Sequence, residues 1–239
     1  MVLQFIFGVC CGYLTTSVCE SLFHRIIQHA SPGQRRAYEN FGLIGRNIIR
    51  AWFSHHVVHH HLTYRDSHTR QFNCERDKAR LDDNLNRTGK HRVIETDYGL
   101  RIGGKSSYFA EFVAPTAPFV LAICYFGGPW RAAGALIPFV LWPLLSQCVH
   151  PYLHQSASQV KSSAPVALRF LARTGCFQYL ARYHWMHHTY TDCNYNLLIG
   201  GDFVLGTYRR PSAEDLRAME GEGLAMPMRR RPRAGLGNS

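Results

Sequence analysis

Three long apolar runs dominate the chain. The first covers residues 1–18, and two more, Phe109–Phe126 and Ala132–Val149, are separated by Gly127-Gly128-Pro129-Trp130-Arg131. Each run approaches the ~20 residues that an α-helix needs to cross a bilayer. The glycines and the proline predict a tight turn, with Trp130 at the membrane interface. The pattern therefore predicts an all-α, integral-membrane protein with an opening span and a transmembrane hairpin.

Two further segments are amphipathic rather than uniformly apolar. Phe41–Phe53 and Ser162–Tyr183 carry apolar side chains with arginines between them. Both are predicted to be helices lying at the membrane interface. For the first of them, a core helix of a soluble protein is the alternative. Residues 62–107 are polar and mixed in charge, and are predicted to form a long loop.

The carboxyl-terminal part of the chain has a different composition. From Ser212 onward it becomes polar and then strongly basic, as in Arg229-Arg230-Arg231-Pro232-Arg233. Such a segment is predicted to be disordered and at most to contact anionic surfaces. The predicted organisation is a catalytic domain over residues 1–211 and a basic tail over residues 212–239.

Histidines gather in four short groups that lie outside or at the ends of the apolar runs. The groups read HRIIQH, SHHVVHHH, HPYLH and HWMHH. In an α-helix, positions i, i+3 and i+4 fall within an arc of about 100°, so each HxxHH spacing directs three imidazoles the same way. A hairpin returns the chain to its starting side, so the four groups are expected to meet. The candidate ligands are His24, His29, His56, His59, His60, His150, His154, His184, His187 and His188.

So many converging imidazoles indicate a metal site. Each buried ring needs a polar partner, and imidazole suits iron, copper, zinc and nickel. Ten rings are enough for two ions. The other four histidines, His55, His61, His68 and His91, are expected to be ordinary surface or core residues. However, His55 and His61 flank the second HxxHH triplet, and either is able to replace one of its members.

The net charge and the cysteines indicate which partners and which cellular compartment to expect. The net charge of +11 would suit nucleic acid, but the aromatic residues lie in apolar runs rather than among the basic ones. Basic residues on the cytoplasmic flanks of membrane spans explain the excess better. The eight cysteines form no CxxC pair, which is typical of a reducing compartment. The site is expected to face the cytoplasm, and no nucleic-acid partner is expected.

Over roughly Glu20–Pro211 the chain resembles the membrane fatty acid hydroxylase superfamily, which includes fatty acid 2-hydroxylases, sterol desaturases and C4-methyl sterol oxidases. The resemblance rests on the order HRxxxH, HxxHH, membrane hairpin, HxxxH, HxxHH, on Glu20 before His24, and on Asp202 in GGDFVLGTYRRP. The opening apolar region offers one span where relatives often have two.

The resemblance implies a cytosol-facing helical cap carrying four histidine boxes around two iron ions, which zinc can replace during purification. It implies that the ten candidate histidines bind these ions and that O2 is the co-substrate. The implied reaction hydroxylates an unactivated C–H bond of a fatty acyl, sterol or related lipid. Glu20, Asp192 and Asp202 are the predicted supporting carboxylates, which would orient the imidazoles. Tyr183 and Trp185 are candidates to line a substrate channel, with ordinary packing as the alternative.

No haem-binding motif or flavin-binding glycine loop is present in the sequence. Electrons are therefore expected from a separate donor, a cytochrome b5 or a ferredoxin with its reductase, and a basic face suits an acidic carrier. A desaturase or a carotenoid-type hydroxylase on the same dimetal centre is an alternative. A non-enzymatic membrane metal-binding protein is less favoured, because transporters place polar groups inside their spans.

Overall fold

The computed structural model describes residues 1–72, 74–87 and 109–224, and the elements within these ranges are helical, with no β-strand among them. The predicted all-α class is confirmed. Two helical segments, Val2–Gln28 and Thr116–Leu153, are long and apolar enough to cross a membrane. His91, residues 73 and 88–107 of the predicted loop and the arginine-rich part of the tail lie outside the described residues.

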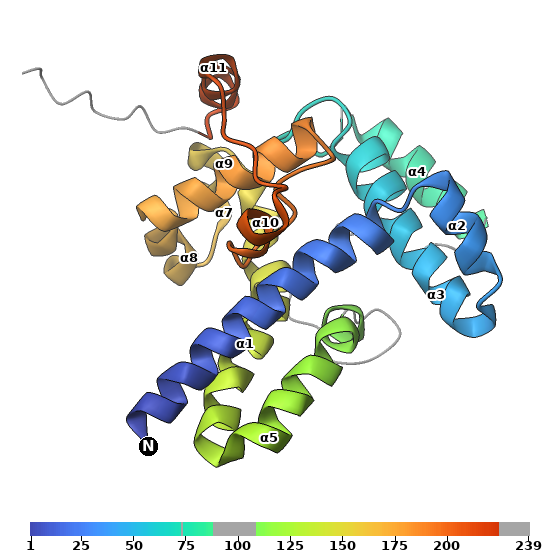
Figure 1. The fold of residues 1–239 in the computed structure, drawn as a ribbon. Helices are drawn as coiled ribbons and strands as arrows, with labels where there is room; N and C mark the ends of the chain where they lie inside the picture. The colour runs from blue at the N-terminus through green and yellow to red at the C-terminus, as the bar shows by residue number, and fades with distance from the viewer. Residues whose placement is uncertain (73, 88–108, 225–239) are drawn as a thin grey trace, which may run out of the picture.

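The helices α1 (Val2–Phe23) and α5 (Phe109–Leu144) form an apolar stem (Figure 1). Helix α5 is broken at Gly128, where φ is 73° and ψ is 173°. Glycine adopts this left-handed φ without the steric cost that a Cβ would bring. The break falls inside the predicted turn, and the two arms of α5 fold back on each other as a hairpin (Figure 1).

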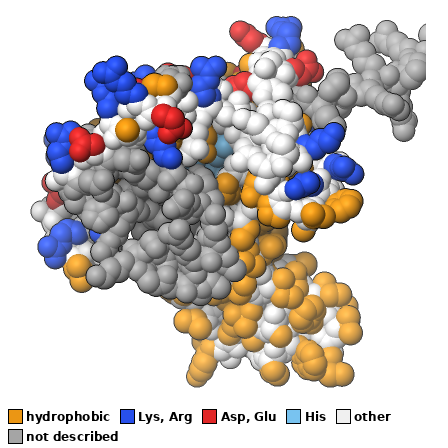
Figure 2. Space-filling model, turned by 180° about the vertical axis from the view of Figure 1, so that it is seen from behind, with side chains coloured by type: hydrophobic (Ala, Val, Ile, Leu, Met, Phe, Trp, Pro, Cys, Tyr) orange, Lys and Arg blue, Asp and Glu red, His pale blue; other side chains and the backbone are white. Residues whose placement is uncertain are grey.

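Glycines allow α1 to approach the second arm of α5 closely. A Cβ added to Gly12 would lie 2.6 Å from the Cα of Ala135, and one added to Gly134 would lie 2.2 Å from the carbonyl oxygen of Phe5. Close backbone contact through small residues is typical of helix pairs in membranes. The side chains that face outward are apolar, for example Leu3 at 82% exposure and Leu121 at 64%. The stem accordingly forms the hydrophobic lower part of the molecule in Figure 2.

The remaining described helices form a cap at one end of the stem (Figure 1). Its amino-terminal half contains η1 (His24–Gln28), α2 (Pro32–Glu39), α3 (Gly42–Trp52), η2 (Phe53–Thr63) and α4 (Glu75–Arg87). Its carboxyl-terminal half contains η3 (Leu145–Val149), α6 (His150–Leu153), α7 (Ala157–Ser163), α8 (Val166–Leu171), α9 (Gly175–Thr189), α10 (Gly201–Leu205) and α11 (Ala213–Gly221). The elements η1, η2 and η3 are π-helical.

Three segments differ from their predicted structure. The predicted loop contains α4, although part of that loop is outside the described residues. The single helix predicted over Ser162–Tyr183 is interrupted, because Pro165 precedes α8 and the Thr174 side chain caps the start of α9. The predicted disordered tail begins with α11, which has a capping box formed by Ser212 and Asp215. Met219 and Leu224 are buried in the core of the cap, so the folded part extends to residue 224.

Candidate metal centre

Two of the histidine groups lie in π-helices. The hydrogen bonds of a π-helix run from residue i to i+5, so it holds more residues per turn than an α-helix. In η1, the His29 N–H donates to the His24 carbonyl oxygen at 2.9 Å. The wider winding brings residues five apart to one side, and it does so for His24 and His29 and also for His55 and His60 in η2. Short π-helical segments frequently occur at functional sites.

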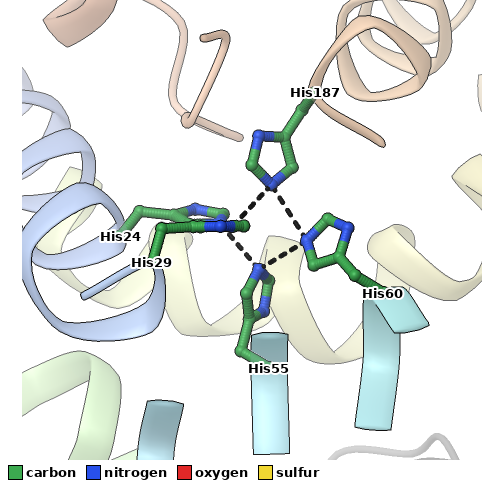
Figure 3. A group of neighbouring side chains, drawn as sticks. All are labelled: His24, His29, His55, His60 and His187. Carbon is green, nitrogen blue, oxygen red and sulfur yellow. Dashed lines mark hydrogen bonds between the residues drawn. The ribbon is translucent and has the colours of Figure 1, made fainter. Parts of the chain in front are cut away.

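The first cluster contains His24, His29, His55, His60 and His187, and one ligand atom of each lies within 4.8 Å of those of the others. Figure 3 shows the five rings turned toward one another from three segments of the chain. The Nε2 atoms of His24 and His55 are 2.7 Å apart, those of His55 and His60 are 3.0 Å apart, and those of His60 and His187 are 3.1 Å apart. Nitrogens bound to one ion at about 2.1 Å would be about 3.0–3.4 Å apart at right-angle or tetrahedral geometry.

Hydrogen bonds on the outer side of the rings fix the nitrogens that face inward. The Nδ1 of His24 lies 2.7 Å from the Tyr195 carbonyl oxygen, and the Nδ1 of His187 lies 2.9 Å from that of Cys193. A carbonyl oxygen only accepts, so both rings carry their proton on Nδ1, and a neutral imidazole has no second proton. Each inward Nε2 therefore presents a lone pair to the cluster. Converging lone pairs repel unless a cation lies between them, and the cluster suits a metal ion for this reason.

The second cluster contains His59, His154, His184 and His188. The Nε2 atoms of His59 and His188 are 3.1 Å apart, and those of His154 and His184 are 2.9 Å apart. The outer nitrogen of His154 again bonds to a carbonyl oxygen, that of His68, at 3.0 Å. The same donor chemistry is thus present a second time.

The two clusters are neighbours, because consecutive histidines serve different clusters. His60 and His187 belong to the first cluster, whereas their neighbours His59 and His188 belong to the second. The rings of His60 and His188 are 4.1 Å apart between centroids. This arrangement suits two metal ions side by side.

Eight of the ten predicted ligands lie in the two clusters. His150 lies beside the second one, with its Nε2 2.8 Å from that of His184. His56 lies behind His29, with the two Nδ1 atoms 3.1 Å apart, while the other nitrogen of His29 faces His187. The first cluster contains His55 at the position that the α-helical spacing had given to His56.

Sequence reasoning gave no role to His68, and it offered His55 only as an alternative to a member of the second HxxHH triplet. The α-helical arc used to select HxxHH excludes His55, whereas the i to i+5 spacing that it shares with HRIIQH would have included it. His68 is buried next to the second cluster, with its ring 4.3 Å from that of His154. Its Nε2 lies 3.0 Å from the Leu153 carbonyl oxygen, and its Nδ1 has no hydrogen-bond partner among the described residues. No spacing in the sequence marks His68.

The three predicted carboxylates are not bonded to imidazoles in the described part of the chain. Glu20 is buried and accepts from the backbone N–H groups of Leu197 and Leu198, at 2.6 and 2.9 Å. Asp202 is buried and accepts from Tyr183 Oη at 2.7 Å and from the Asn196 N–H at 3.0 Å. Both carboxylates thereby fix the loop around residues 193–198, whose carbonyl oxygens hold His24 and His187. Asp192 is exposed.

Burial keeps four of the clustered imidazoles neutral, those of His60, His184, His187 and His188. Desolvation lowers the pKa of His187 to about 3, although its bond to the Cys193 carbonyl opposes the shift. Desolvation also holds the pKa values of His60, His184 and His188 well below the usual value, and neighbouring histidines add to the effect. Neutral imidazole is the form that binds metal. The rings are therefore ready to bind metal ions at neutral pH.

No protein family, curated protein or solved structure matches this chain. The two histidine clusters and their position beside the apolar stem are the features of the molecule that bear on its function.

Proposed function

We propose that the chain is a membrane-bound, O2-dependent di-iron oxygenase that hydroxylates an unactivated C–H bond of a lipid or lipid-like substrate. The observation that carries this proposal is the pair of adjacent, largely buried histidine clusters. In them the inward Nε2 atoms of His24, His187 and His154 carry lone pairs. A storage or surface site needs neither the burial nor the paired arrangement. The resemblance of the histidine boxes to membrane fatty acid hydroxylases supports the same reaction class.

The donor set fits the two metal ions. The first cluster would hold one ion through up to five imidazoles, and the second would hold the other through four, with His150 and His68 nearby. All of these ligands are neutral nitrogens, so the pair would keep its full positive charge, and two iron ions supply O2 activation when bound. Backbone carbonyl oxygens of Tyr195, Cys193 and His68 hold three of the rings in orientation.

The surrounding chain suits an apolar substrate. His24 directly follows α1, and His150 directly follows η3, which continues the apolar segment of α5. A lipid lying along the stem would therefore have its chain next to the clusters. Burial of the histidines also excludes bulk water from the site, which protects a reactive centre from side reactions.

The proposal includes an external electron donor. Hydroxylation by O2 uses two electrons from outside the substrate, because one oxygen atom enters the product and the other leaves as water. A cytochrome b5 or a ferredoxin with its reductase would supply them. A desaturase or a carotenoid-type hydroxylase on the same centre is the closest alternative, since the outcome depends on which substrate carbon lies near the metals.

The test combines metal analysis with product analysis. The protein is purified in detergent, and the transition metals per chain are measured for the wild type and for His60→Ala/His184→Ala, which removes one ligand from each cluster. His61→Ala is the matched control, because His61 is exposed and belongs to neither cluster. About two ions per chain are expected for the wild type and the control, with clear loss in the double variant.

Lipids from expressing cells are then examined under isotopically labelled O2. Label in a hydroxylated lipid with the wild type and with His61→Ala, but not with the double variant, supports the oxygenase. Loss of hydrogen without label identifies the desaturase instead. Two bound ions with neither product, in the presence of a competent electron donor, would leave a non-enzymatic metal-binding protein.

A further inference from the structure

A second concave site lies in the cap, formed by α7, α8 and α9. It has a volume of about 110 Å³. Its floor is apolar and includes Val160, Phe177 and Leu224, which are buried. None of its lining residues belongs to the histidine clusters. It is therefore separate from the candidate metal centre.

Three cations line this cavity without a compensating acid. Lys161, Arg169 and Arg173 are all lining residues, and no aspartate or glutamate is among the lining. None of the three forms an ion pair with another residue in the described ranges. The Arg169 Nε donates to the Ala164 carbonyl oxygen at 2.6 Å. This bond fixes the guanidinium at the rim and leaves its terminal N–H groups for a ligand.

The flank around the cavity is both hydrophobic and basic. On α8, Val166 is 64% exposed and Phe170 is 63% exposed, next to Arg169. In Figure 1, α7 and α8 lie on the left of the cap, which is the right side of Figure 2 because that view is turned by 180°. On that side, Figure 2 shows hydrophobic and basic side chains together above the hydrophobic stem. Apolar residues beside cations are typical of a surface that lies at the boundary between headgroups and acyl chains.

We propose that this cavity binds the headgroup of an anionic phospholipid and thereby seats the cap on the bilayer. The phosphate would bind Arg169, Arg173 and Lys161 at the rim. The glycerol backbone and the first methylenes would cover the apolar floor around Phe177. A free phosphate would make no use of that floor, and a zwitterionic headgroup would bring a positive charge to a site that already has three. The proposal goes beyond the reaction at the metal centre and does not depend on it.

The experiment measures binding of short-chain phosphatidylglycerol to the purified protein in a neutral detergent, with phosphatidylcholine of equal chain length and inorganic phosphate as comparison ligands. Phosphatidylglycerol is expected to bind more tightly than both. Arg169→Ala/Arg173→Ala is expected to weaken its binding by about thirtyfold, because each basic residue near a membrane surface contributes about fivefold. Arg210→Ala/Arg217→Ala is the matched control, since it removes the same charge from exposed positions outside the cavity.

A third variant separates a defined cavity from general charge attraction. Ala172→Trp fills the cavity without changing the charge, and it is expected to abolish the preference for phosphatidylglycerol over phosphatidylcholine. A melting temperature in detergent equal to that of the wild type shows that the cap of each variant is folded. Four results would each overturn the proposal. Two concern the wild type: it binds the two lipids equally, or it binds inorganic phosphate as tightly as phosphatidylglycerol. Two concern the variants: the control pair loses as much affinity for phosphatidylglycerol as Arg169→Ala/Arg173→Ala, or Ala172→Trp binds phosphatidylglycerol fully. Failure of the metal or product assay would not affect this result, so the two proposals are tested separately.

Discussion

Replacing His55 or His56 distinguishes the π-helical arrangement from the α-helical one. The spacing HxxHH assigns His56 to the metal, whereas the structure places His55 in the first cluster, 2.7 Å from His24 and 3.0 Å from His60 between Nε2 atoms. His56 reaches only the outer nitrogen of His29. Alanine at these two neighbouring positions should therefore have different effects on metal affinity.

The magnitudes follow from the roles of the two rings. Metal sites with four ligands bind with about 10–16 kcal/mol, or about 2.5–4 kcal/mol per ligand, so loss of His55 should weaken the first site by roughly 10²–10³-fold. Loss of a residue that orients a ligand costs about 10–100-fold, and the half-buried His56 should lie near the lower end. His56→Gln, which keeps a hydrogen-bonding group beside His29, should recover most of that loss, and His55→Gln should not recover.

The assay is competition with chelators of graded strength, followed by measurement of the metal retained per chain. In His55→Ala one of two ions should be lost to a weaker chelator, while the second cluster keeps its ion. In His56→Ala both ions should remain until a stronger chelator is used. If His56→Ala loses an ion while His55→Ala keeps both, the α-helical spacing is correct and the π-helical placement of His55 is refuted.

Three further predictions concern the stem, the metal-free cluster and the carboxyl-terminal segment. Gly12→Val should separate α1 from α5 and lower the melting temperature in detergent, because a Cβ at this position would lie 2.6 Å from Ala135 Cα. Gly33→Ala is the control and should leave the melting temperature unchanged, because a Cβ there meets no atom within 4 Å. In the metal-free protein, the folded-state pKa of His187 at about 3 lies below its unfolded value of about 6.5, so the unfolded chain binds more protons between these values. The free energy of unfolding should therefore fall as the pH is lowered from about 6.5 towards 3, and a melting temperature that is flat over this range would contradict the burial of neutral rings. Glu222→Gln should destabilise the cap by about 1–3 kcal/mol in chemical denaturation, because the Glu222 carboxylate accepts hydrogen bonds from Ser67, Thr69 and Trp185. Glu220→Gln, at an exposed site, is the control. Equal losses of stability in the two variants would refute the structural role of Glu222.

The sequence by itself determined the helical class, the turn between the two arms of α5 and most of the clustered histidines. Apolar runs of span length have one stable backbone solution in a bilayer, which is the helix, and the glycines at residues 127–128 mark the place where it breaks. The four histidine groups lie outside or at the ends of such runs, and they converge because a hairpin returns to its starting side. These features follow from local composition and spacing, which a sequence carries directly.

Tertiary structure alone decided which ring of each group faces which cluster. The choice of His55 over His56 depends on the π-helical winding of η2, in which backbone hydrogen bonds run from residue i to i+5. His68 and Glu222 lie far from the histidine boxes along the chain, and only the folding of the carboxyl-terminal segment against α9 brings Glu222 to Trp185. The carbonyl oxygens of Cys193 and Tyr195, which set the tautomers of His187 and His24, belong to the backbone. No residue type in the sequence marks a carbonyl oxygen for such a role, so only the folded chain could show it.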